Sequence, residues 1–128
     1  MKKIISTAGA PAAIGPYSQA TEYQGVIYVS GQLPLDPKTG VLSQDDIQSQ
    51  TRLVLNNVSH ILQAGGSSLA HILKVSILLK DINDFAAVNE AYAAFFPENP
   101  PARVCYQAAA LPKDARIEME VIAIKEES

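Results

Sequence analysis

Residues 44–80 read QDDIQSQTRLVLNNVSHILQAGGSSLAHILKVSILLK, a segment in which a helix-like pattern passes directly into a strand-like one. In the first part, large apolar residues recur at helical spacing, which predicts an amphipathic helix over Gln44–Ala64. The apolar stripe consists of Ile47, Val54, Leu55, Val58, Ile61 and Leu62. Ser43 and Asp46 have the spacing of a capping box, and the Gly65-Gly66 pair predicts a left-handed stop at the other end.

The second part, Ile72–Lys80, alternates with the period of a β-strand. One face would carry only apolar residues, namely Leu73, Val75, Ile77 and Leu79. The opposite face mixes apolar residues with Lys74, Ser76 and Lys80, and Arg116–Ile124 repeats this two-faced pattern. Helices can cover the apolar face, whereas the mixed face predicts packing against further copies of the chain.

The remaining elements complete an α+β pattern. A second helix is predicted to begin after Asn83 or Asp84 and to end before Pro97. Further strand-like runs are Lys2–Ile5, Ser18–Tyr23, Val26–Ser30 and Arg103–Ala110. The order ββ(β)αβαββ predicts one sheet packed on one face by two helices, and residues 1–128 form a single domain because no linker or repeat divides them.

Composition narrows the classes of function. Thirteen acidic against ten basic residues give a formal net charge of −3, which disfavours nucleic acid as a partner. No apolar run is long enough to span a membrane, and the first residues lack the apolar stretch of a secretion signal. The single cysteine, Cys105, cannot form an internal disulfide. We therefore expect a cytoplasmic protein.

The reactive side chains form no obvious metal or nucleotide site. His60 and His71 do not belong to a ligand-spaced cluster, so no metal is expected. No glycine-rich loop opens a helix to hold a phosphate, so no nucleotide cofactor is expected either. Strand alternation places Arg103 with Cys105, and Glu118 with Glu120, each pair on one side of its strand. Taken alone, these are more simply interpreted as solvated charges or an ion pair than as catalytic groups.

Several motifs change this interpretation when they are considered together. Six motifs occur in order along the chain. The N-terminal half contains AAIGPYSQA at 12–20 and VSGQLP at 29–34. The C-terminal half contains the pattern Asp84-Phe85, Asn89, Tyr92, then Pro101-Ala102-Arg103, Leu111-Pro112-Lys113-Asp114 and Ile117-Glu118-Met119-Glu120. Together they resemble the RidA/YjgF family over nearly the whole chain. The resemblance implies a chorismate-mutase-like α+β fold, assembled as a homotrimer with clefts between subunits. It also implies a cofactor-free imine deaminase that converts 2-imino acids to 2-oxo acids and ammonia.

Site residues follow from the same resemblance. Arg103 would hold the substrate carboxylate, and the remaining residues that line or support the cleft would be Tyr17, Ser30, Gly31, Asn89, Cys105 and Glu118. A planar guanidinium suits a carboxylate, and Glu118, with a backbone carbonyl near Cys105, would orient the attacking water. We expect Arg103 to lie near Glu118 and to lower the pKa of its carboxyl group. Tyr17 would relay a proton to the leaving nitrogen.

Alternatives remain at this stage. Gly31 is equally well explained by turn geometry, Ser30 by a backbone bond at a strand end, and Asn89 by a link from the helix to a loop. A sensor that binds a small carboxylate in the same cleft, without turnover, would use the same residues. A purely structural oligomer is a third possibility, while ribonuclease activity has little support in an acidic chain without paired catalytic histidines.

Overall fold

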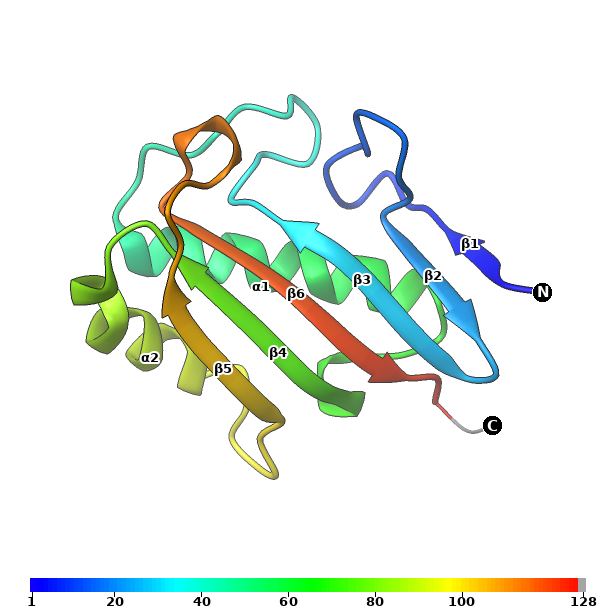
Figure 1. The fold of residues 1–128 in the computed structure, drawn as a ribbon. Coiled ribbons are helices and arrows are strands. Elements are labelled where there is room, and N and C mark those ends of the chain that lie inside the picture. The colour runs from blue at the N-terminus through cyan, green and yellow to red at the C-terminus, as the bar shows by residue number, and fades with distance from the viewer. Residues whose placement is uncertain (127–128) are drawn as a thin grey trace.

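The computed structural model describes residues 1–126, which form one mixed sheet backed by two helices (Figure 1). The elements are β1 (Lys3–Ile5), β2 (Ala20–Tyr23), β3 (Val26–Gln32), α1 (Ile47–Ala64), β4 (Ile72–Leu79), α2 (Phe85–Ala93), β5 (Ala102–Gln107) and β6 (Ile117–Ile124). The six strands lie in the order β1-β2-β3-β6-β4-β5. Only β4 and β5 pair in parallel, because α2 crosses between them. The predicted α+β class and element order are confirmed.

Both helices lie on the same face of the sheet (Figure 1). The stripe of α1 is fully buried at Val54, Leu55, Val58, Ile61 and Leu62, and it packs on sheet residues such as Ile27, Val75, Ile77, Met119 and Val121. Burial of this kind is worth roughly 1.5–3 kcal/mol for each large apolar side chain. No helix within residues 1–126 has the length and hydrophobicity to cross a bilayer.

No helix of the described residues 1–126 covers the other face of the sheet (Figure 1). Residues that lie directly opposite one another on adjacent strands point to the same face. Leu78 lies opposite both Glu118 and Tyr106, and Tyr28 lies opposite Ile122, so these side chains share the open face. Tyr28 and Tyr106 are each about half exposed. The open face is therefore both apolar and charged, as the sequence predicts.

The ends of α1 differ from the prediction. The helix begins at Ile47 rather than Gln44, because Asp46 is the N-cap and accepts a hydrogen bond from the backbone N–H of Ser49 at 3.2 Å. The prediction of a capping box formed by Ser43 and Asp46 is therefore wrong. At the other end only Gly66 has a left-handed backbone, with φ of 80°, whereas Gly65 has φ of −92°.

Two strands also depart from the simple alternation. The pairing of β4 with β6 shifts between Ile72 and Lys74, so Ile72 is buried and Leu73 is 50% exposed. Leu73 was expected on the buried face, and the irregularity explains why it is not there. β5 ends at Gln107 rather than Ala110, because the chain leaves the sheet there toward the buried side chain of Leu111.

Candidate active site

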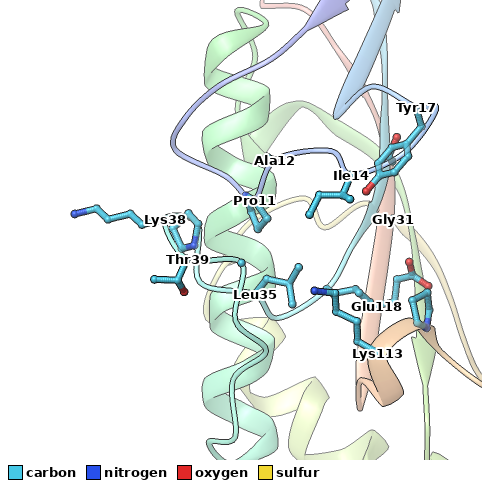
Figure 2. A pocket seen from close by; sticks show the side chains of 15 residues that line it. Pro11, Ala12, Ile14, Tyr17, Gly31, Leu35, Lys38, Thr39, Lys113 and Glu118 are labelled. Carbon is cyan, nitrogen blue, oxygen red and sulfur yellow. The ribbon is translucent and has the colours of Figure 1, made fainter.

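One cavity of about 750 Å³ gathers four of the residues expected in the site (Figure 2). Glu118 comes from β6, Ser30 and Gly31 come from β3, and Tyr17 comes from the loop before β2. Apolar side chains form much of the remaining wall, including Ile14, Leu33, Leu35 and Pro112. A cavity with one carboxylate among apolar walls is suited to a small polar molecule.

Hydrogen bonds from Ser30 of β3 and from Gln19, the residue before β2, hold the loop that carries Tyr17. The Ser30 hydroxyl donates to the carbonyl of Ser18 at 2.6 Å, and the Ser30 N–H donates to the carbonyl of Gln19 at 2.9 Å. The buried Gln19 side chain donates to Pro11 O at 2.8 Å and accepts from the N–H of Thr7 at 2.7 Å. Ser30 therefore holds the loop by hydrogen bonds to its backbone. Of the two roles considered for this residue, lining the cleft and bonding to backbone, the structure shows that it does both.

Gly31 lies directly against Glu118. A Cβ atom added at Gly31 would collide with the Glu118 carboxyl group, so any larger residue here would have to displace the carboxylate, and the reason for glycine is close approach rather than a left-handed turn. We expect Gly31→Ala to displace the carboxylate and, if the chain has the imine-hydrolysing activity that the motifs imply, to lower its kcat/KM about 10-fold without loss of the fold. In a double-mutant cycle, Gly31→Ala should add little to Glu118→Gln, whereas fully additive losses would contradict this assignment.

The pKa of Glu118 is raised, because the carboxyl group is partly buried and the charge of Glu120 lies nearby. The expectation that Arg103 lowers this pKa is wrong within one chain. Arg103 lies opposite Val75 in the β4–β5 pairing, and Val75 belongs to the buried face covered by the helices. Glu118 lies on the open face, so the two side chains project from opposite sides of the sheet.

Arg103 belongs to a second cluster, where α2 meets the edge strand β5. The guanidinium Nη1 donates a 2.6 Å hydrogen bond to Oδ1 of Asn89. Its central carbon lies 5.6 Å from the ring centroid of Phe85 and 5.0 Å from that of Tyr92, within the range of cation–π attraction. Cys105 shares this face of the strand. Asn89 therefore orients Arg103 and does not merely attach the helix to a loop.

Within residues 1–126 neither histidine contacts the Cys105 thiol, because His60 and His71 bond to Gly9 and Ser68. Partial burial raises the pKa of its thiol, an effect only partly offset by the Arg103 charge, so the thiol is a poor nucleophile at neutral pH. We expect Cys105→Ser to retain kcat/KM within about 3-fold of the wild type, because serine preserves the size and polarity of the side chain. Complete loss of activity in a folded Cys105→Ser protein, measured in the same assay, would instead indicate covalent catalysis.

Sequence reasoning did not find every residue around these two clusters. Phe85 and Tyr92 lie on the same helix stripe as Asn89, and this spacing was the signal that could have placed them beside Arg103. Leu35 and Lys113 line the cavity from loops distant in sequence. Lys113 belongs to the motif at 111–114, but the motif did not indicate that its side chain reaches the cavity.

The histidines make local contacts. His60 Nδ1 lies 2.7 Å from the carbonyl of Gly9, and His71 Nδ1 lies 2.9 Å from the Ser68 hydroxyl. Within residues 1–126 no three histidine, cysteine, aspartate or glutamate side chains gather as metal ligands would.

The fold and the cavity place the chain among small α+β proteins that build a ligand cavity from loops at the end of a sheet. More specifically, the chain belongs to the RidA/YjgF family. The family model, described as Endoribonuclease L-PSP, matches residues 7–125.

Similar proteins cover the chain almost completely. A RutC family protein of Pyrococcus horikoshii is 52% identical over 98% of this chain and 100% of its own length. A human 2-iminobutanoate/2-iminopropanoate deaminase is 47% identical over 98% of this chain and 91% of its own length. The crystal structure of E. coli TdcF with bound serine has a TM-score of 0.92 and 44% identity, and the match covers 97% of this chain and 99% of that one. The resemblance found in the motifs is confirmed.

Proposed function

We propose that this protein hydrolyses small 2-imino acids, such as 2-iminopropanoate (with its tautomer 2-aminoacrylate) and 2-iminobutanoate, to 2-oxo acids and ammonia. The observation that carries the proposal is the placement of Glu118 in a cavity suited to a small molecule, together with a preoriented Arg103 at the sheet edge. The human relative is named for this activity. TdcF binds serine, a small molecule with a carboxylate beside a nitrogen-bearing carbon, as these substrates have.

The site requires two subunits in this proposal. Because Arg103 and Glu118 project from opposite faces of one sheet, each chain supplies two incomplete halves. A cyclic homotrimer, packed through the open apolar face, would bring Arg103 of one subunit to the Glu118 cavity of the next. Light scattering should then give about three times the chain mass of 13.7 kDa. A stable monomer at micromolar concentration would contradict the shared site.

The reaction needs water and no cofactor. The substrate is R–C(=NH)–COO⁻, and the guanidinium of Arg103 binds its carboxylate through two parallel hydrogen bonds. Glu118 accepts a proton from a water molecule as the water oxygen bonds to the imine carbon, and that proton passes to the imine nitrogen, which gives the intermediate R–C(OH)(NH₂)–COO⁻ and restores the carboxylate. The hydroxyl proton of this intermediate then moves to the amino nitrogen as the carbon–nitrogen bond breaks, which releases ammonia and R–CO–COO⁻.

The raised pKa of Glu118 suits this role, since a more basic carboxylate is a better proton acceptor. Substrate binding pairs the positive charge of Arg103 with the substrate carboxylate, which leaves the charge of Glu118 to act on the water. Tyr17 lies in the same cavity, and its hydroxyl would relay a proton to the leaving nitrogen.

Ammonia release from an imine generated in situ tests the proposal. An amino-acid oxidase or a dehydratase supplies the imine, and the protein is added at a concentration far below that of the substrate. Acceleration over spontaneous hydrolysis, with many turnovers per subunit, is the expected result. Stoichiometric binding without acceleration would favour the carboxylate sensor instead.

A further inference from the structure

The cavity beside Glu118 is larger than an imino acid of three or four carbons requires. Its volume of about 750 Å³ lies within the range that holds drug-sized ligands, and it extends past Glu118 along Ile14, Leu33 and Leu35. These apolar residues offer no partner to a substrate carboxylate. The space is therefore suited to a substrate side chain several atoms long, directed away from the reacting carbon.

Lys113 brings a positive charge into this space. Figure 2 shows its side chain running from the loop between β5 and β6 toward Leu35, whereas the ammonium group of Lys38 points away from the cavity. Lys113 forms no ion pair within residues 1–126, although Lys3, Lys80 and Lys125 do. Its ammonium group is therefore available to an anion that enters the cavity.

The backbone that carries Lys113 is strained and firmly held. Lys113 and Asp114 have φ values of 58° and 57°, in the left-handed region that residues other than glycine rarely adopt. Asp114 forms a 2.8 Å ion pair with Lys80, and the buried Ala115 donates to the carbonyl of Pro112 at 3.1 Å. Strained backbone of this kind is common at ligand sites, and here it places the Cα atom of Lys113 at the edge of the cavity.

We propose that Lys113 binds a second carboxylate at the far end of the substrate side chain, so that the cavity accepts 2-imino dicarboxylates such as 2-iminoglutarate. This inference rests on the proposed imine hydrolysis. Arg103 of the neighbouring subunit binds the carboxylate beside the imine, and the methylene groups lie along the apolar wall. The reaction is unchanged: water adds to the imine carbon, the carbon–nitrogen bond breaks, and the products are 2-oxoglutarate and ammonia.

Substrate selectivity of Lys113→Gln tests this assignment. Three imines are compared: 2-iminoglutarate, 2-imino-4-methylpentanoate, which is of similar size but has no second carboxylate, and the small 2-iminopropanoate. Loss of one solvent-accessible charged contact should lower kcat/KM for 2-iminoglutarate about 5- to 10-fold and leave the other two within about 2-fold. Lys113→Arg should retain most of the activity, and Lys38→Gln, which removes a lysine directed away from the cavity, should change none of the three values.

A binding measurement separates this inference from the proposed function. Calorimetry of 2-oxoglutarate and 2-oxobutanoate needs no turnover, so it remains informative if the wild type accelerates no imine. Lys113→Gln should weaken 2-oxoglutarate binding about 5-fold or more and leave 2-oxobutanoate unaffected. An equal effect on both ligands, or no effect on either, would overturn the assignment of Lys113, and so would a uniform loss of kcat/KM across the three imines.

Discussion

Replacing Arg103 with alanine is expected to lower kcat/KM for 2-iminobutanoate by about 10- to 150-fold. A hydrogen-bonded charge pair contributes about 1.5–3 kcal/mol, and a substrate this small offers few other contacts. Arg103 is also oriented before substrate arrives, by the 2.6 Å bond to Asn89 and by two aromatic rings. Arg103→Lys keeps the charge but loses the planar two-point contact, so it should recover little of the activity.

Steady-state ammonia release measures this effect, and the mass of each variant in solution shows whether it still assembles. Glu120→Gln is the matched control, because Glu120 is a surface carboxylate of β6 that does not line the Glu118 cavity. If trimeric Arg103→Ala turns over 2-iminobutanoate at nearly the wild-type rate, Arg103 does not bind the substrate carboxylate.

Replacing Glu118 with glutamine is expected to lower kcat about 100-fold or more, because the amide cannot accept the proton of the attacking water. The wild-type enzyme should lose activity as the pH falls through the pKa of Glu118, which lies above the ordinary value of 4.5. The same loss should be absent from the residual activity of Glu118→Gln. Glu120→Gln on the same strand should remain active, but its activity should fall at a lower pH than that of the wild type, because the Glu120 charge that helps to raise the pKa of Glu118 is gone.

Stability separates a catalytic effect of Glu118→Gln from an unfolding effect. A raised carboxyl pKa means that the folded state disfavours the charge, so this group reduces stability as the pH rises through that pKa. Removing the charge should therefore leave the midpoint of thermal unfolding at pH 7 equal to or above that of the wild type. A lower midpoint at pH 7 would show that the Glu118 charge is stabilising in the assembled protein.

Mixing the two inactive variants tests whether the site is shared. Arg103→Ala and Glu118→Gln chains are mixed in equal amounts, unfolded and reassembled. A site is then intact where a Glu118→Gln chain supplies its unmutated Arg103 and the adjacent Arg103→Ala chain supplies its unmutated Glu118. Random cyclic assembly makes about one quarter of the sites intact. Recovery of about that fraction of wild-type activity is expected, whereas no recovery would place the complete site within one chain.

Most elements of the fold could be predicted from local patterns. The stripe of α1 and the alternation in β4 and β6 are periodic over enough residues to determine their type and their buried face. Boundaries were less certain: Asp46 rather than Ser43 begins the helix, since both residues offer a capping oxygen and only the three-dimensional path of the chain selects one. The irregularity at Leu73 also has no local signal, because it depends on the pairing of β4 with β6.

In the candidate site, too, some features could be predicted from the sequence and others depend on the tertiary structure. The motifs in the sequence predicted a set of candidate site residues, which stays a prediction. The sequence by itself also determined which of them share a side of one strand, as Arg103 does with Cys105, because strand alternation is a local property. Only the tertiary structure decided that Arg103 and Glu118 face opposite sides of the sheet. Their relation depends on the register across β5, β4 and β6 and on the crossover through α2, which are contacts between residues distant in the chain.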